Sequence, residues 1–205
     1  WEGVYEALQT LADDPEARLL IVSGHGGKAF ASGADISKFE QERSSPKDVD
    51  AYNVITARAY DALYNFPKPT LAKINGYCIG GGMALAICCD MRIAQQKSKF
   101  GVPAAKLGLG YGYEGVERLA NVVGTSTATE IFYTARQFTS GEAYEMGLIN
   151  RVVPDDELDT FVDDYAKKIS ENAPLTIAAI KQIKLAINSA PDQRDHQRID
   201  KMVRA

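Results

Sequence analysis

The sequence predicts an α/β fold built on a mostly parallel sheet, followed by a helical C-terminal region. Short, continuous apolar runs alternate with amphipathic stretches of helical length, and no strand pattern follows Asp156. Apolar runs without alternation are typical of strands that are buried on both faces. A helix between two such strands returns the chain to the same end of the sheet, so we expect the strands to pair in parallel.

Four apolar runs are expected to form the strands, and they cover residues 18–24, 69–76, 91–94 and 150–154. Helical patterns separate them over residues 4–11, 49–64, 83–89, 115–123 and 126–134. Beyond Asp156, an Asn-Ala-Pro sequence at 172–174 divides the chain into two long helices, because proline cannot continue a helix. This helical end has no strand of its own to cover, so it is expected to cap the core or to pack on a neighbouring subunit.

Composition excludes several classes of protein. The 205 residues are enough for one sizeable core or at most two small ones. The formal net charge of −4 gives no positive field for nucleic acid or anionic lipid, and no apolar run approaches the ~20 residues of a membrane span. The start of the chain does not resemble a signal peptide. Three cysteines, two of them adjacent, do not form a disulfide framework, so we expect a soluble, cytoplasmic protein.

Two glycine-containing segments each follow a predicted strand. Gly80, Gly81 and Gly82 precede an apolar helix, and the N–H groups at a helix N-terminus have no partner within the helix. Residues 26–36 (GGKAFASGADI) follow the first strand, and their spacing fails the phosphate-loop pattern. Two such loops can each donate one N–H to a single oxygen, which is the geometry of an oxyanion hole. For the glycine triplet alone, a tight strand-to-helix turn is the alternative interpretation.

Four motifs carry a resemblance to a known family: KAFASGADI, NGYCIGGGMALAICCD, FGVPAAKLGLG and FTSGEAYEMGLINRVVP. In this order and at this spacing, residues 4–187 resemble the enoyl-CoA hydratase/isomerase (crotonase) family. The resemblance implies a spiral of ββα units and acyl-CoA thioester substrates, with no separate cofactor. It also implies a homotrimer or a dimer of trimers. The charge and the absence of a long apolar run, noted above, predict neither a nucleic-acid nor a membrane partner. Residues 1–154 would form the acyl-CoA-binding core, and residues 155–205 a helical region for oligomerisation and site closure.

The same resemblance assigns functional residues by motif position. The two oxyanion-hole amides fall on Ser32 and Gly81, and the segment that contacts the adenine and pantetheine of CoA falls on residues 28–36. The substrate-binding residues implied in this way are Lys28, Ala29, Ala31, Ala34, Asp35, Ile36, Gly80, Ala84 and Ala104. Ser32 would act through its backbone N–H, so its hydroxyl need not take part.

Two positions depart from the hydratase pattern. The resemblance to hydratases of the family implies a glutamate two residues after the glycine triplet and another directly after FGxP. This chain has Ala84 and Ala104 at these positions. Two carboxylates are needed to deprotonate water and to protonate the α-carbon, and general acid–base catalysis contributes ~10²–10⁴-fold. The sequence therefore predicts a protein that is not a conventional enoyl-CoA hydratase.

Tyr111 and Glu114 are the remaining candidates for catalytic side chains. A tyrosine at this position, together with SENAPLTIAAIKQIK, resembles the methylmalonyl-CoA decarboxylase branch of the family, although Ala34 replaces that branch's histidine. Loss of CO₂ generates an enolate without a base, and a phenol can orient the carboxylate. The alternatives are that Tyr111 only lines an acyl pocket and that Glu114, like Glu117, only suits the start of a helix.

Other polar residues are assigned structural roles. Cys88 and Cys89 lie in an apolar helix and are expected to pack in the core. Asp90 is interpreted as structural, and Lys181 and Lys184 as part of a solvated helix face or, in an oligomer, as phosphate contacts. No group of residues has the spacing of metal ligands, so no metal is expected.

The sequence as a whole predicts an acyl-CoA-processing enzyme, a lyase or isomerase, that stabilises a thioester enolate in a two-amide oxyanion hole. A non-catalytic acyl-CoA-binding or scaffold protein is the alternative, and an RNA-binding relative is disfavoured by the acidic charge. The family usually begins with a strand pair before the first helix and ends with a tail that closes the CoA site. Because the chain starts at Trp1 and stops at Ala205, we expect it to be a fragment of a longer protein.

Overall fold

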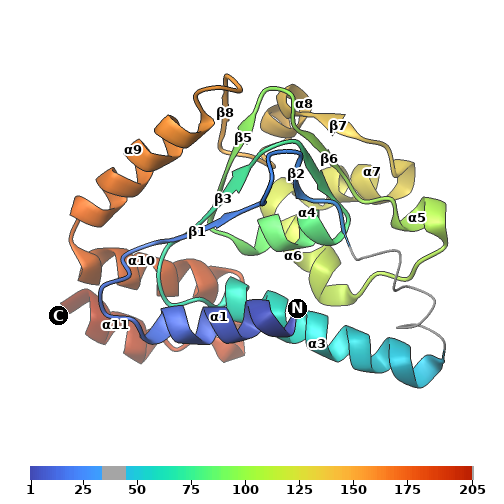
Figure 1. The fold of residues 1–205 in the computed structure, drawn as a ribbon. Coiled ribbons are helices and arrows are strands. Elements are labelled where there is room, and N and C mark those ends of the chain that lie inside the picture. The colour runs from blue at the N-terminus through green and yellow to red at the C-terminus, as the bar shows by residue number, and fades with distance from the viewer. Residues whose placement is uncertain (34–44, 205) are drawn as a thin grey trace.

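The computed structural model describes residues 1–33 and 45–204, and in this part of the chain the strands form two four-stranded sheets (Figure 1). The first sheet has the order β1-β3-β5-β8, and all its neighbouring strands run parallel. Its strands are β1 (Leu20–Ser23), β3 (Thr70–Ile74), β5 (Met91–Gln95) and β8 (Arg151–Val153). They coincide with the four apolar runs of the sequence, so the predicted parallel sheet is confirmed.

A second sheet was not predicted. It has the order β2-β4-β6-β7, with an antiparallel pairing only between β6 and β7. Its strands are β2 (Ala29–Ala31), β4 (Tyr77–Ile79), β6 (Lys99–Gly101) and β7 (Phe138–Thr139). Strands of two or three residues are too short to show a periodicity. Because β2, β4 and β6 each follow a strand of the first sheet, the chain repeats the order strand, strand, helix.

The helices separate these strand pairs and form the C-terminal end. They are α1 (Glu2–Asp13), α3 (Pro46–Tyr64), α4 (Gly81–Cys88), α5 (Ala104–Leu107), α6 (Tyr113–Val123), α7 (Thr125–Thr134), α8 (Ser140–Glu145), α9 (Leu158–Glu171), α10 (Pro174–Ile187) and α11 (His196–Arg204). The long helices up to α10 match the predicted ranges, and α10 begins with its proline as expected. The expectation of two long helices beyond Asp156 is wrong, because a second break around Pro191–Gln193 separates α10 from a third helix, α11. The short helices α5 and α8 were missed, although Thr139 and Glu142 form a capping box at the start of α8.

The main hydrophobic core surrounds α4, which lies centrally in Figure 1. A helix that is apolar all round is expected to be buried. The buried residues of α4 are Gly82, Met83, Ala84, Ala86, Ile87 and Cys88. The core around them includes Phe30, Phe100 and Phe138, which come from three strands of the second sheet. The position of α4 is therefore fixed from several sides.

The helical end caps the core of the same chain. Leu158 and Val162 of α9 form a second buried cluster with Leu71, Ile93 and Val153 of the first sheet. The expectation that this end has no strand to cover is therefore wrong, because α9 covers one face of the parallel sheet. In Figure 1, α9 and α10 lie on the same side of the molecule as β1.

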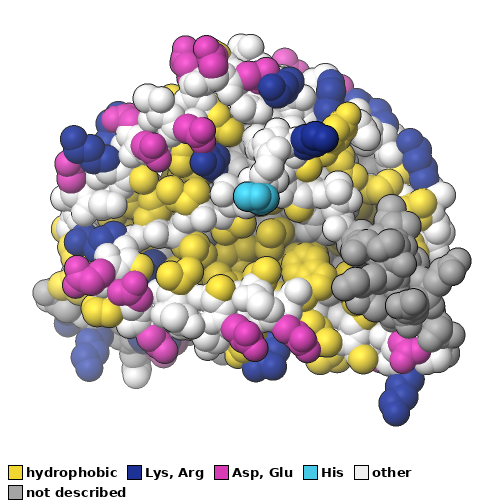
Figure 2. All heavy atoms as spheres, in the orientation of Figure 1, with side chains coloured by type: hydrophobic (Ala, Val, Ile, Leu, Met, Phe, Trp, Pro, Cys, Tyr) yellow, Lys and Arg dark blue, Asp and Glu magenta, His cyan; other side chains and the backbone are white. Residues whose placement is uncertain are grey.

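Charged side chains of both signs are interspersed along the edges of the face shown in Figure 2, and hydrophobic side chains gather across its middle. This face therefore presents no extended basic surface. Among the described residues, no helix has both the length and the apolar character that crossing a bilayer requires.

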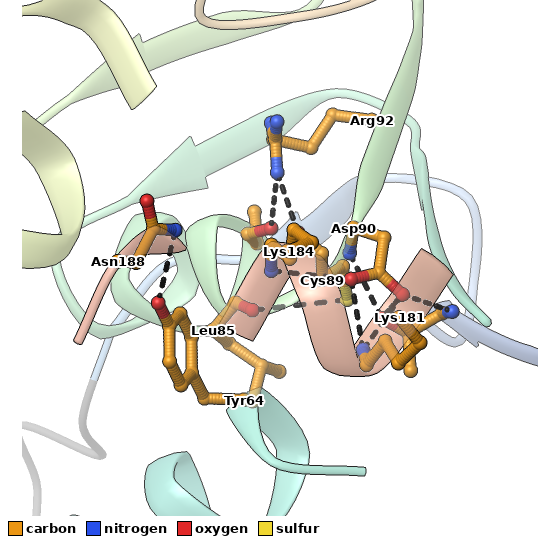
Figure 3. Close-up of polar contacts among 10 residues, drawn as sticks. Tyr64, Leu85, Cys89, Asp90, Arg92, Lys181, Lys184 and Asn188 are labelled. Carbon is orange, nitrogen blue, oxygen red and sulfur yellow. Dashed lines mark hydrogen bonds and ion pairs between the residues drawn. The ribbon is translucent and has the colours of Figure 1, made fainter. Parts of the chain in front are cut away.

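Asp90 joins the end of α4 to α10 (Figure 3). Its carboxylate accepts hydrogen bonds from Lys181 Nζ at 2.7 Å, from Lys184 Nζ at 3.2 Å and from Thr70 N at 2.9 Å. The structural interpretation of Asp90 is confirmed. The solvated face predicted for the two lysines is wrong, because the Lys181 side chain is only 3% exposed and both ammonium groups pair with Asp90.

Candidate functional site

The two glycine-containing segments of the sequence meet at the N-terminus of α4. A Cβ atom added at Gly33 would lie 3.7 Å from Gly81 N, and one added at Gly81 would lie 3.5 Å from Gly33 Cα. Gly33 directly follows Ser32, which is exposed at the end of β2. The backbone of the first segment therefore passes beside the first amide of α4.

The turn into α4 requires glycine at two of its three positions. Gly80 has φ +56°, which other residues adopt only with strain. A Cβ atom at Gly82 would lie 2.1 Å from the carbonyl oxygen of Ala31, so β2 can approach α4 only where there is no side chain. Glycine is therefore needed to bring the two segments together.

Among residues 1–33 and 45–204, the amide of Gly81 has no hydrogen-bond acceptor in this turn. It is the first residue of α4, so its N–H has no acceptor within the helix. The residue before it is held at both of its backbone polar groups, because Gly80 N donates to Gly101 O at 2.8 Å and Gly80 O accepts from Ala84 N at 3.0 Å. The positive end of the helix dipole also lies here. Such a site favours an oxygen that carries partial or full negative charge.

Alanines occupy the two positions that the resemblance described above assigns to the hydratase glutamates. Ala84 lies three residues after Gly81 on α4, and Ala104 begins α5 directly after Pro103. Pro103 borders the turn, because its Cδ would lie 3.9 Å from a Cβ atom at Gly80. Ala84 and Ala104 are both buried. Neither methyl group can donate or accept a proton.

The ring of Tyr111 is packed against neighbouring side chains, and its hydroxyl has no hydrogen-bond partner among the described residues. Its ring packs edge-on against Phe132 with 4.8 Å between centroids, and a Cβ atom at Gly115 would lie 2.5 Å from Tyr111 Cε1. Burial, and secondarily Cys88, raises the pKa of Tyr111 to about 12. Within the described part of the chain, no residue hydrogen-bonds to its hydroxyl. Tyr111 is therefore a neutral phenol at physiological pH, able to donate a hydrogen bond to a ligand.

Glu114 lies in the first turn of α6 and is exposed. A carboxylate at this position suits the helix dipole. Its neighbour Tyr113 is also exposed and donates a hydrogen bond to Glu117 at 3.1 Å. The catalytic role of Glu114 stays a prediction.

The structure adds Tyr60 to this site, a residue that the sequence analysis did not single out. Its hydroxyl donates a hydrogen bond to the carbonyl oxygen of Gly81 at 3.2 Å. The Trp1 ring packs edge-on against the Tyr60 ring with 4.8 Å between centroids. Burial, followed by Tyr111 and Cys88, raises the pKa of the Tyr60 phenol far above its ordinary value. Helical periodicity places Tyr60 on α3, but no local pattern connects it to Gly81.

The segment expected to contact CoA is described only in part. Lys28 is exposed, and Ala29 and Ala31 are half-buried. The loop expected over residues 28–36 is partly wrong, because Ala29–Ala31 form β2. Three of the predicted substrate-binding residues, Ala34, Asp35 and Ile36, lie outside the described residues.

The cysteines are core residues, as expected. Cys88 and Cys89 are both buried. Burial is the largest cause that raises the pKa of the Cys88 thiol to about 11 and that of Cys89 to about 12. Both thiols therefore stay protonated at neutral pH, and an inert thiol is a packing group rather than a nucleophile.

The structure thus has a glycine-lined helix start that packs against β2 and β4, in a chain that repeats the order strand, strand, helix. The sequence profile of the enoyl-CoA hydratase/isomerase family matches residues 2–203. A solved structure described as an enoyl-CoA hydratase/carnithine racemase from Magnetospirillum magneticum aligns with a TM-score of 0.93 at 35% identity, covering 98% of this chain and 75% of that one. The chain belongs to the enoyl-CoA hydratase/isomerase family.

The alignments span about two thirds to three quarters of the length of the relatives that the chain matches. Crotonyl-CoA hydratase of Syntrophomonas wolfei is 36% identical over 178 residues, which are 87% of this chain and 68% of that protein. Carnitinyl-CoA dehydratase of Salmonella agona is 34% identical over 194 residues, which are 95% of this chain and 73% of that protein. The relatives thus share the fold and carry more than one named activity.

Proposed function

We propose that this protein processes acyl-CoA thioesters by stabilising an enolate at the N-terminus of α4. The single observation that carries the proposal is the close approach of the backbone at Gly33, directly after Ser32, to the first amide of α4 at Gly81. Two amides aimed at one oxygen, from Ser32 and Gly81, would stabilise the charge that develops there as the α-carbon becomes carbanionic. One such donor is worth ~10²–10³ in rate.

The absence of carboxylates at positions 84 and 104 points to a reaction that needs no acid–base pair. We propose a lyase or isomerase reaction, with decarboxylation as the favoured case. When a 2-carboxyacyl thioester loses CO₂, the electrons of the breaking C–C bond form the enolate, which then takes a proton from solvent. Tyr111 would donate a hydrogen bond to the departing carboxylate. Coenzyme A belongs to the substrate, so the proposed reaction needs no separate cofactor.

Turnover measured over a panel of CoA thioesters tests this proposal. We expect slow or absent hydration of crotonyl-CoA, below the ~10 s⁻¹ that is the median for enzymes. We expect faster CO₂ release from a malonyl-type thioester. Hydration of crotonyl-CoA at ~10 s⁻¹ or above would contradict the proposal and would direct attention to Glu114.

A non-catalytic acyl-CoA binder is the second candidate, and the pair Ala84 and Ala104 is the observation that favours it. A binder would retain affinity for CoA thioesters, measured by calorimetry, and would turn over no member of the panel. Release of product from any member of the panel would exclude it.

We also propose a homotrimer or a dimer of trimers, formed through the C-terminal helices. Large apolar side chains are exposed on α10 and α11, namely Leu175, Ile180, Ile187 and Val203. Covering them would remove apolar surface from water. Light scattering after size exclusion should give a mass three or six times that of the chain, and a monomer would contradict this assembly.

A further inference from the structure

Three successive glycines form a flexible backbone, and flexibility makes it difficult to hold a hydrogen-bond donor in one direction. The energetic advantage of an oxyanion hole depends on donors that are aligned before the charge develops. Contacts from outside the turn must therefore restrain it. Gly80 is restrained by its bonds to Gly101 and Ala84, and Gly82 by the backbone of Ala31.

Gly81, between them, is restrained from α3. The Tyr60 hydroxyl donates to Gly81 O at 3.2 Å, and it lies 3.1 Å from the place that a Cβ atom on Gly81 would occupy. Among the described residues, the bond from Tyr60 is the one hydrogen bond that a side chain donates to the backbone of Gly80–Gly82. It holds the peptide that follows Gly81, while the bond from Ala84 N to Gly80 O holds the peptide that contains the Gly81 amide.

Tyr60 is itself held. Trp1 packs against its ring, and the Trp1 indole donates to the Tyr52 hydroxyl at 3.1 Å. Tyr60 and Tyr52 both lie on α3, two turns apart, so Trp1 connects two points of the same helix. The Tyr60 hydroxyl thus approaches Gly81 from a ring with little freedom to turn.

We propose that Tyr60 is a positioning residue, whose hydroxyl fixes the direction in which Gly81 presents its amide to the substrate oxygen. The proposal rests on the oxyanion hole proposed above. It assigns to Tyr60 no contact with the substrate, so removal of the hydroxyl should weaken recognition of the thioester oxygen and leave CoA binding intact.

The test compares two ligands that differ only in that oxygen: butyryl-CoA and its thioether analogue S-butyl-CoA. Calorimetry measures the affinity of each ligand. The ratio of butyryl-CoA affinity to S-butyl-CoA affinity is then compared between the parent protein and Tyr60→Phe. We expect the substitution to lower the ratio by about three- to tenfold, the value of one hydrogen bond. Affinity for S-butyl-CoA should not change, which also shows that the variant is folded. On any thioester that is turned over, kcat should fall with KM little changed.

Tyr64→Phe is the matched control. Tyr64 lies one turn further along α3, and its hydroxyl accepts a hydrogen bond from Asn188 Nδ2 at 3.2 Å, away from the glycines. The ratio of butyryl-CoA affinity to S-butyl-CoA affinity should be the same for Tyr64→Phe as for the parent protein. An unchanged ratio in Tyr60→Phe would overturn the positioning role while leaving the oxyanion hole in place. A parent protein without preference for the thioester would overturn both.

Discussion

Lys181 Nζ lies 2.7 Å from Asp90 Oδ2, and the lysine side chain is only 3% exposed. Lys184 joins the same carboxylate from the next turn of α10, and Thr70 donates to it from β3. On the opposite side, Arg92 donates to the carbonyl oxygen of Cys89 at 2.7 Å and so binds the C-terminal end of α4. Two buried charged groups therefore anchor α4 at the end away from the glycines.

Replacing Asp90 by asparagine should strongly destabilise the protein. Lys181 would lose the carboxylate opposite its buried ammonium group, and removal of one partner of a buried ion pair costs ~3–5 kcal/mol. Urea unfolding followed by circular dichroism measures the change. The control is Asp164→Asn, which breaks the exposed pair with Lys168 and should cost less than ~1 kcal/mol. Equal effects of the two substitutions would show that burial of the Asp90 pair contributes nothing.

The same carboxylate should make stability depend on pH in the acid range. Burial alone would raise the pKa of Asp90, but Lys181, Lys184 and the Thr70 N–H together hold it below its ordinary value. A lowered pKa in the folded state gives stability that is complete above the unfolded value of ~3.9. That stability is lost as the pH falls through the folded-state pKa. Urea midpoints should therefore decline below about pH 4, and the decline should be shallower in Asp90→Asn. If the urea midpoint declined equally steeply with falling pH in the parent and in Asp90→Asn, the loss of stability in acid would be due to groups other than Asp90.

Gly82→Ala tests the close approach of β2 to α4. The added Cβ would lie 2.1 Å from Ala31 O, which is backbone and cannot move aside without shifting the strand. We expect a loss of about 3 kcal/mol or more, at the upper end for overpacking, measured as the free energy of unfolding. Gly141→Ala is the control: it lies in α8 with the nearest atom 3.9 Å from the added Cβ, and should stabilise by up to ~1 kcal/mol. A Gly82→Ala protein as stable as its parent would contradict the contact.

Tyr111→Phe separates the two interpretations of that residue. It keeps the ring against Phe132 and removes only the hydroxyl. If the hydroxyl orients the reacting group, kcat on the best thioester of the panel should fall at least tenfold while KM changes little. If Tyr111 only lines the pocket, the variant should match the parent. Tyr133→Phe, at an 82% exposed position on α7, is the control and should leave kcat unchanged.

The sequence was informative where a pattern is local. The apolar runs at 69–76 and 91–94 predicted β3 and β5, because strands buried on both faces need continuous apolar residues. The short strands of the second sheet could not be predicted, since β7 has only two residues and is defined by its pairing with β6. Pairing depends on residues distant in the chain, and a single sequence does not show it.

The same distinction applies to the site. The glycine triplet and the two alanines could be identified because they lie in recognisable motifs. Tyr60 lies 21 positions before Gly81, and Lys181 lies 91 positions after Asp90. Neither contact has a local signal, and a lysine on a helix pattern is usually solvated. The structure was needed to bring these residues together.

One helix of eight residues, α4, separates the free amide of Gly81 from the anchor at Asp90. At 1.5 Å per residue this is a rod about 12 Å long. Because α4 is packed along its length, we expect a displacement at one end to be transmitted to the other. Substitutions in α10 that never meet a substrate are therefore expected to alter reaction rates, which gives evolution a second, remote set of positions for tuning this chemistry.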